Sequence, residues 1–175
     1  MILRKAAINE DEKILNFYKE VIESIKGSDF KPKWNEKHPD LEFLQNSIKK
    51  EELCLYLNGD EIVSSFILNN RFDVDYSNVK WQVEAKFSEI TVIHTFAINP
   101  KYAGKDYARK IFNQIKNIAN LENKKTIRID IIDRNDGAQK VFKKLGFEYI
   151  DTREINHPIV GLVKFHLYEY PLKEK

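Results

Sequence analysis

The chain has 175 residues, of which 42% are hydrophobic and 32% charged. This composition is typical of a single domain that buries its own core, and it excludes a largely disordered, collagen-like or repetitive protein. The 29 basic and 27 acidic residues leave a formal net charge of +2. No basic excess is therefore available for the phosphate backbone of a nucleic acid, and we expect no nucleic-acid partner.

Cysteine usage and hydropathy bear on location. The single Cys54 lies in an apolar run, which favours a small buried residue in a reducing compartment over a disulfide or a nucleophile. No apolar stretch approaches the roughly 20 residues of a membrane span. The first residues become charged too early for a signal peptide. We expect a cytoplasmic protein without a membrane partner.

The first part of the chain predicts one short strand and two helices. Residues 2–6 are typical of a strand, and Asn9 is the expected N-cap of a helix with apolar residues at helical spacing that ends at Gly27. The stretch 28–39 is expected to be irregular. Asp40 is the expected N-cap of the second helix.

A β-hairpin follows. Residues 53–57 and 61–68 are β-like runs joined by Asn58, Gly59 and Asp60, and Asn-Gly between such runs is the strongest short-range hairpin signal. Residues 69–88 are polar and mixed, and the sequence assigns them no role. Residues 89–98 predict a strand that stops at Asn99-Pro100, with Ile90, Val92, His94, Phe96 and Ile98 on one face.

The second half alternates helices and strands. Helices are expected over 105–120 and 133–145, with Gly146 at the C′ position of the latter, and strands over 126–132, 147–153 and 160–170. The last strand is expected to be exposed and able to pair across a two-fold axis in a homodimer. The expected fold is α/β: one domain over residues 1–175, with a mixed, mostly antiparallel sheet of about seven strands and about four helices on both faces.

Two blocks of this sequence resemble a known family. Residues 94–111, which read HTFAINPKYAGKDYARKI, are similar to the acetyl-CoA signature of the GNAT family of N-acetyltransferases. Residues 135–147, which read NDGAQKVFKKLGF, are similar to the family segment Asn-x-x-Ala-x-x-x-Tyr-x-x-x-Gly-Phe. The resemblance implies the GNAT fold, acetyl-CoA as the acetyl donor and transfer to a primary amine of a small molecule or peptide.

The physical chemistry of the first block agrees with the resemblance. A strand that ends at Pro100 leads into a tight turn at residues 102–105 and a helix start, where backbone N–H groups lack partners and the helix dipole favours an anion. We expect the amides of residues 103–108 to bind a diphosphate. The resemblance further implies that the main chain of residues 96–98 pairs with the pantetheine arm. The residues expected to bind the cofactor are Phe96, Ala97, Ile98, Ala103, Gly104, Lys105, Asp106, Tyr107, Ala108, Arg109, Asn135 and Phe142. Asn135 also suits a helix N-cap, and both roles can coexist.

Three positions depart from the family pattern. The family pattern is Gln/Arg-x-x-Gly-x-Gly/Ala, and the corresponding residues here are 103–108. Ala103 replaces the glutamine or arginine, so one polar anchor is lost. Asp106 replaces a glycine. We expect Asp106 to be a first-turn acid that points away from the anion. Phe142 occupies the place of a tyrosine that often reprotonates the departing thiolate, and a phenyl ring has no proton to give.

The chemistry requires removal of a proton from the amine and stabilisation of an oxyanion, which a strand amide can supply. His94 is a candidate base, with a sheet-packing role as the alternative. Asp130 and Glu89 are rival bases, with structural or solvated roles as alternatives. Tyr149 or Tyr168 is the candidate acid.

The acceptor is left open by the sequence. Aromatic and imidazole side chains in irregular or edge regions can line an acceptor pocket or pack long loops; they are Trp34, His38, Tyr76, Trp81, His157 and His166. The four histidines lack metal-type spacing, so no metal is expected. A second hypothesis is a catalytically weak acyl-CoA-binding sensor or regulatory module.

Overall fold

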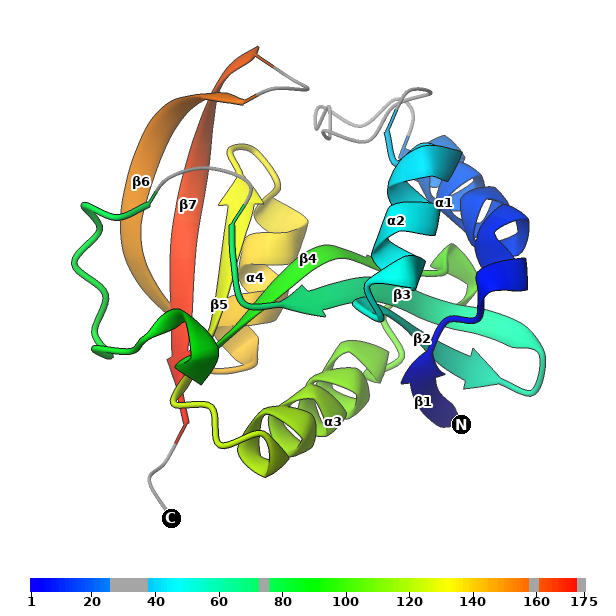
Figure 1. Ribbon diagram of the computed structural model, residues 1–175. Helices are drawn as coiled ribbons and strands as arrows, with labels where there is room; N and C mark the ends of the chain where they lie inside the picture. Colours follow the sequence, from blue (N-terminus) through cyan, green and yellow to red (C-terminus); the bar gives the residue numbers. More distant parts are fainter. Residues whose placement is uncertain (26–37, 73–75, 158–160, 173–175) are drawn as a thin grey trace. The chain divides into compact units, whose positions relative to one another are not determined.

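The structure is a computed structural model that describes residues 1–25, 38–72, 76–157 and 161–172 (Figure 1). Its elements, in chain order, are β1 (Ile2–Lys5), η1 (Ile8–Glu10), α1 (Asp11–Ile25), α2 (Leu41–Lys49), β2 (Leu53–Asn58), β3 (Glu61–Asn69), η2 (Phe87–Glu89), β4 (Ile90–Ile98), η3 (Pro100–Tyr102), α3 (Tyr107–Leu121), β5 (Thr126–Ile132), α4 (Asp136–Lys144), β6 (Glu148–His157) and β7 (Gly161–Pro171). The strand order is β1-β2-β3-β4-β5-β7-β6. The pair β4–β5 is parallel, and β1–β2, β2–β3, β5–β7 and β6–β7 are antiparallel. This confirms the mixed seven-stranded sheet with four α-helices.

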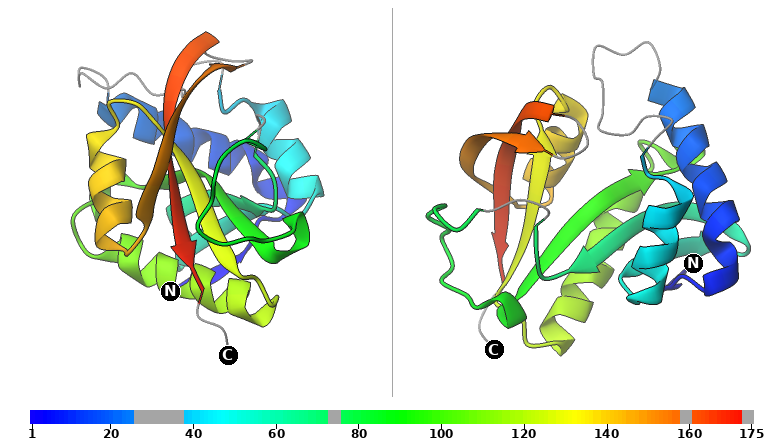
Figure 2. Two further views of the ribbon diagram at one scale, coloured as in Figure 1. Left: turned by 90° about the vertical axis from the view of Figure 1, so that its left-hand side faces the viewer. Right: turned by 45° about the horizontal axis from the view of Figure 1, so that its top comes forward.

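The chain divides into two compact units, which we describe separately. The first comprises residues 1–68 and 94–111. Alternate residues of β2 point to the same face, and there Leu53, Leu55 and Leu57 pack under the apolar stripes of α1 and α2. Figure 2 shows these two helices side by side. Tyr56 belongs to the opposite face, and its ring centroid lies 6.5 Å from that of Tyr107 at the start of α3.

The second unit comprises residues 69–93 and 112–175. Phe165 and Leu167 of β7 pack on one side with Tyr76 and Val79 of the segment that follows β3. On the other side, Tyr170 lies against Phe112 of α3, with ring centroids 5.0 Å apart. The polar segment to which the sequence assigned no role therefore helps to cover one face of the strands β5, β7 and β6.

The hairpin and two helix termini agree with the sequence predictions. Residue Asn58 pairs with Glu61, so the loop is Gly59-Asp60, with Gly59 at φ 58°; a glycine at the first loop position is typical of the type II′ turn. The Asp40 carboxylate accepts a hydrogen bond from the Phe43 amide at 2.8 Å, as expected of an N-cap. Gly146 has φ 96° just after α4, which confirms its C′ position.

Other details of the prediction are wrong. Asn9 lies inside η1, where Glu10 rather than Asn9 caps the turn by accepting from the Ala7 amide. Helices α3 and α4 begin two and three residues later than expected. The last strand is not an edge, because β7 lies between β5 and β6 and the edge of this half of the sheet is β6. Gly27 and Trp34 lie outside the described residues.

Candidate functional site

The end of β4 carries two local signs of strain. Thr95 has φ 46°, a left-handed conformation that is exceptional for a β-branched residue. Its buried side-chain oxygen has no hydrogen-bond partner among the described residues. An unpaired buried hydroxyl and an unfavourable backbone angle each cost free energy, and such features cluster at functional sites.

Neighbouring groups hold this part of β4 in place. The Tyr18 hydroxyl donates to the Thr95 carbonyl at 2.9 Å, and the Ser64 hydroxyl donates to the Ala97 carbonyl at 2.6 Å. Burial raises the pKa of Tyr18 to about 12, so it remains a donor at neutral pH. The left-handed residue also interrupts the strict alternation of β4, and Ala97 rather than Phe96 is buried. The prediction that His94, Phe96 and Ile98 share one uninterrupted strand face is therefore wrong.

The turn after β4 presents a row of backbone donors. The Asn99 side chain accepts from the Lys101 amide at 3.0 Å, and the Ala103 amide donates to Pro100. Within the described chain, the N–H groups from Gly104 to Arg109 donate to no protein acceptor; the first helical bond runs from Lys110 to the Asp106 carbonyl. Three corrections follow from this: the α3 helix starts later, the Ala103 amide is already engaged, and Asp106 precedes the helix instead of lying in its first turn.

The backbone angles explain how these donors converge. Gly104 has φ 72° and Asp106 has φ 61°, on either side of Lys105. When residues of positive and negative φ alternate, successive N–H groups can turn toward one concave side and form an anion-binding nest. The helix that follows adds its positive dipole end. We call the N–H groups of residues 104–109 the amide cradle.

Side-chain contacts hold the turn that carries the amide cradle. The Tyr102 hydroxyl and the Lys101 ammonium both donate to the Glu61 carboxylate of β3, and these bonds lower the pKa of Glu61. The Tyr102 ring lies edge-on to Tyr107, with centroids 5.2 Å apart. The turn is thus tied to the sheet before any ligand arrives.

The second sequence block forms α4 and its cap. The Asn135 side-chain oxygen accepts from the Ala138 amide at 3.1 Å, so the N-cap role is confirmed. Phe142 is 3% exposed, and its ring lies edge-on to Phe147 with centroids 5.2 Å apart. No proton donor stands at this helical position.

The candidate catalytic residues fall into both units. His94 is half-buried in the middle of β4 and belongs to the first unit. Asp130 of β5 belongs to the second unit, where its carboxylate accepts from the Tyr76 hydroxyl at 3.1 Å. Glu89 accepts from the Lys86 amide and pairs with Lys125, and these contacts lower its pKa; they indicate a capping role. Tyr168 is 1% exposed and donates to Gln139.

Tyr149 belongs to a continuous hydrogen-bonded chain that the sequence did not predict. Its hydroxyl lies 2.8 Å from Thr152 Oγ1, which lies 2.7 Å from His166 Nδ1, and His166 Nε2 lies 3.0 Å from Asp133 Oδ1. His166 lowers the pKa of Asp133. If Nε2 carries the imidazole proton, each group can donate to the next or accept from it, so the chain connects an exposed phenol to a carboxylate. A register of two antiparallel strands brings these residues together, which no local pattern signals.

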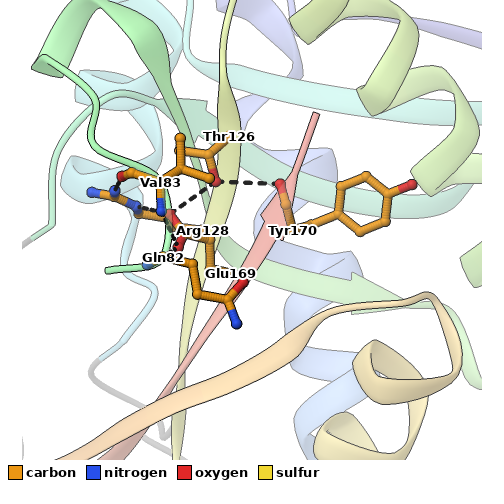
Figure 3. A network of polar contacts seen from close by, with 6 residues as sticks. All are labelled: Gln82, Val83, Thr126, Arg128, Glu169 and Tyr170. Atoms are coloured by element: carbon orange, nitrogen blue, oxygen red, sulfur yellow. Dashed lines mark hydrogen bonds and ion pairs between the residues drawn. The ribbon is translucent and has the colours of Figure 1, made fainter. Parts of the chain in front are cut away.

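A buried ion pair anchors the segment between β3 and β4 (Figure 3). Arg128 Nε lies 2.7 Å from Glu169 Oε1, and these side chains are 6% and 0% exposed. The other Glu169 oxygen accepts from the Gln82 and Val83 amides, and Arg128 donates to the Val83 carbonyl. Desolvation lowers the pKa of Arg128, and Glu169 counteracts this by hydrogen bonding. One basic and one acidic residue inside two apolar strand runs were the available sequence signal for this pair.

A cavity of about 510 Å³ opens beside this pair. Its lining, all in the second unit, is Asn70, Arg71, Phe72, Tyr76, Ser77, Trp81, Ala85, Lys86, Phe87, Ile90, Val92 and Arg128. Two of the aromatic residues named from the sequence as acceptor candidates, Tyr76 and Trp81, are among them. His38 instead packs edge-on against Phe43, with ring centroids 4.6 Å apart.

Two findings concern metals and membranes. Among the described residues, no group of three or more His, Cys, Asp and Glu side chains is placed to hold a metal ion. In the same part of the chain, no helix combines the length and the hydropathy that a membrane crossing requires.

Comparison with known proteins identifies the fold. The family model for "Acetyltransferase (GNAT) family" matches residues 19–147. A GNAT-family acetyltransferase from Streptococcus agalactiae 2603 superimposes with a TM-score of 0.81 at 18% identity, over 99% of this chain and 96% of that one. A second, from Listeria monocytogenes 4b F2365, gives 0.73 at 17% identity over 98% and 94%. The structure of yncA from Salmonella typhimurium with its cofactor acetyl-CoA gives 0.68 at 13% identity over 99% and 95%. No curated protein sequence matches the chain significantly.

Proposed function

The chain belongs to the acetyltransferase (GNAT) family, and on that premise we propose that it moves an acetyl group from acetyl-CoA to a primary amine of a small molecule or peptide. The observation that carries this proposal is the amide cradle: six consecutive N–H groups, from Gly104 to Arg109, lie at the start of a 15-residue helix and have no acceptor among the described residues. A diphosphate supplies the acceptors that these groups lack. The structure of yncA with acetyl-CoA supports the choice of cofactor.

We assign the remaining contacts of the cofactor to residues of α3, β4 and α4. Lys105 and Arg109 add positive charge beside the cradle. The β4–β5 ladder extends only from Ile90 to Val92, and we assign the main chain of residues 96–98 to the amides of the pantetheine arm. Asn135 keeps its side-chain amide nitrogen for the cofactor while its oxygen caps α4. Phe142 is assigned an apolar contact.

Thr95 is the residue that we add to this site. Its buried oxygen without a partner can donate a hydrogen bond to a carbonyl group of the cofactor, which would repay the desolvation of the hydroxyl. Replacement by valine keeps the shape of the side chain and removes the donor. We expect Thr95→Val to weaken acetyl-CoA binding about 5- to 20-fold, whereas Thr95→Ser retains most of the affinity.

Calorimetric titration with acetyl-CoA tests the proposal directly. We expect saturable binding with a 1:1 stoichiometry, and no heat with acetate or pantetheine at the same concentration. Absence of binding at near-millimolar acetyl-CoA would refute the cofactor assignment. An acetyl-CoA titration of a Gly104→Val variant is the matched control, because a β-branched residue resists φ 72° and distorts the cradle.

The transfer requires a base for the amine and an acid for the thiolate. We assign the base to His94 or Asp130 and the acid to Tyr149, whose exposed phenol can give its proton to the thiolate and regain one from water. General acid–base groups contribute about 10²- to 10⁴-fold in rate. The variants His94→Gln, Asp130→Asn and Tyr149→Phe test each role: a catalytic group lowers kcat and changes the pH–rate profile without changing acetyl-CoA affinity.

A second candidate function is a catalytically weak acyl-CoA-binding sensor. It is favoured by Phe142, a buried ring at the helical position where the family often has a tyrosine. Release of free thiol in the presence of a broad panel of amines separates the two functions. Sustained turnover with any acceptor supports the enzyme, and acetyl-CoA binding without turnover supports the sensor.

The proposal includes a cytoplasmic location, no nucleic-acid or membrane partner, no metal, and a homodimer as the assembly to test. The near-neutral charge of +2 supports the absence of a nucleic-acid partner. Because β6 is an edge strand, it is the strand to test for pairing between two copies, by light scattering of the purified protein.

A further inference from the structure

Three side chains of the second unit are arranged as a nucleophile, a base and a carboxylate that orients the base. Thr152 Oγ1 of β6 lies 2.7 Å from His166 Nδ1 of β7, and His166 Nε2 lies 3.0 Å from Oδ1 of Asp133, which directly follows β5. A hydroxyl within hydrogen-bond reach of a base that a third group orients is a signature of nucleophilic catalysis. We call these three residues the Thr-His-Asp triad.

Strand register and a β-bulge place these side chains together. Thr152 and His166 are paired directly across the antiparallel strands β6 and β7, so their side chains lie on the same face of the sheet. The register shifts between Tyr149 and Asp151. Residues three apart in a regular strand point to opposite faces, whereas this irregularity brings the Tyr149 hydroxyl to within 2.8 Å of Thr152 Oγ1. Bulges are over-represented next to active sites, where they redirect a side chain.

The carboxylate sets the direction of each hydrogen bond. The hydrogen bond with His166 lowers the pKa of Asp133, so this side chain is an ionised acceptor. A neutral imidazole therefore carries its proton on Nε2 and presents the lone pair of Nδ1 to Thr152, whose hydroxyl is the donor. Tyr149 in turn donates to Thr152 Oγ1. The base thus accepts a hydrogen bond through the same proton that a nucleophilic threonine has to lose.

The triad is partly exposed to solvent. The side chains of Asp133 and His166 are 44% and 20% exposed, Thr152 is half-buried, and Tyr149 is 52% exposed. A small acyl donor can therefore approach beside the phenol. In the tetrahedral intermediate, the oxyanion is bonded through one carbon atom to Thr152 Oγ1, so it lies within reach of the phenol, which can stabilise it as a hydrogen-bond donor.

We propose that Thr152 is an acyl-accepting nucleophile and that the Thr-His-Asp triad hydrolyses small activated esters, such as aryl acetates. Thr152 Oγ1 attacks the ester carbonyl while its proton passes to His166 Nδ1. The bond from the acyl carbon to the aryl oxygen then breaks, and the imidazolium gives its proton to the departing oxygen. In the second step the imidazole takes a proton from water, which attacks the acetyl-threonine, and returns it to Thr152 Oγ1 as acetate leaves. This activity goes beyond acetyl transfer and requires no coenzyme.

Hydrolysis of p-nitrophenyl acetate by the whole protein, without coenzyme, tests the proposal. Release of p-nitrophenolate is followed by absorbance, and the acylated protein is quenched with acid and digested with trypsin. Cleavage after Lys144 and Arg153 releases the peptide 145–153, which contains Tyr149 and Thr152 but no lysine. An acetyl group on this peptide is therefore attached to an oxygen, and fragmentation in the mass spectrometer distinguishes the two hydroxyls.

We expect catalytic turnover and an acetyl group on Thr152. Thr152→Val keeps the shape of the side chain, and both Thr152→Val and His166→Gln should lower turnover about 10²-fold, whereas Thr152→Ser keeps the hydroxyl and the activity. Asp133→Asn can present an N–H to Nε2 and favour the tautomer that blocks Nδ1, so we expect a loss of about 10-fold or more. Ser88→Ala, which removes an exposed hydroxyl of η2, should change nothing. Urea unfolding of each variant separates loss of activity from loss of the fold.

Three results would overturn the proposal. They are no release of p-nitrophenolate above the uncatalysed rate, equal turnover in Thr152→Val and the unaltered protein, and an acetyl group on Tyr149 or a lysine in place of Thr152. Because acetyl-CoA is absent from the assay, each of these results is distinct from a failure of acetyl transfer.

Discussion

Replacement of Asp106 by glycine should strengthen acetyl-CoA binding, although it removes an ion pair. The Asp106 carboxylate is 62% exposed, and its Oδ1 lies 3.2 Å from Arg109 Nε. The residue also has φ 61°, which glycine adopts at no steric cost. The substitution therefore keeps the turn, removes a negative charge from an anion site and releases Arg109 for the phosphates.

The magnitude follows from Coulomb's law. If the Asp106 carboxylate lies about 7 Å from a bound diphosphate with two negative charges, Coulomb repulsion between them is about 1.2 kcal/mol in water. At physiological ionic strength, a Debye length of about 8 Å reduces this to about 0.5 kcal/mol. We therefore expect the Kd of acetyl-CoA to fall about 8-fold at low salt and about 2-fold at 0.15 M salt. Release of Arg109 adds to both values.

Calorimetric titration at the two salt concentrations measures the effect. Asp106→Asn is the matched control, because asparagine tolerates the left-handed backbone and lacks the charge, so its affinity should rise equally. Asp106→Ala should unfold at lower denaturant concentration, since alanine at positive φ costs about 1 kcal/mol. An unchanged Kd in both Asp106→Gly and Asp106→Asn, or a gain that does not depend on salt, would refute the placement of the diphosphate at the amide cradle.

Three further predictions concern stability. Arg128→Met leaves Glu169 buried without its partner and should lower the free energy of unfolding in urea by about 3–5 kcal/mol, whereas the double variant Arg128→Met/Glu169→Leu should recover much of this loss; equal stability of the single and double variants would argue against a buried pair. Arg4 lowers the pKa of Glu10 to about 2, so this contact stabilises the fold fully above the ordinary pKa of about 4.3 and is lost as the pH falls through 2. After solvent screening we expect Glu10→Gln to remove about 1 kcal/mol at pH 7 and only a small part of this at pH 2, as measured by urea unfolding at each pH. Gly146→Ala should cost about 1–3 kcal/mol, because φ is 96° and the new Cβ would lie 3.2 Å from an aromatic ring carbon; thermal unfolding measures this, and an unchanged Tm would contradict it.

The order of elements was predictable because the sequence of each strand and helix carries short-range signals of its own secondary structure. Apolar residues at a period of two or 3.6, the Asp40 cap and Gly146 are short-range signals, and each agrees with the structure. The errors occur where distant residues compete with such signals. Glu10, held by Arg4, takes the cap that Asn9 suggested. The final strand resembles an edge in sequence, yet β6 pairs outside it.

The proposed coenzyme site was predictable in part from the sequence and in part only from the tertiary structure. The order strand, turn and helix start was legible from residues 94–111, because backbone amides at a helix start need no partner from elsewhere in the chain. The identity of the individual N–H donors was not predictable from the sequence. It depends on the left-handed backbone conformation of Gly104 and Asp106, in a turn that contacts Glu61 and Tyr107 through Tyr102.

By itself, then, the sequence determined the element order, the fold class and the position of the amide cradle, all of which depend on residues close together in the chain. Only the tertiary structure decided the Arg128–Glu169 pair, the chain from Tyr149 to Asp133 and the aromatic cavity. Each of these joins side chains from separate elements, and strand register, which places them within a few ångströms of one another, is a property of the assembled sheet.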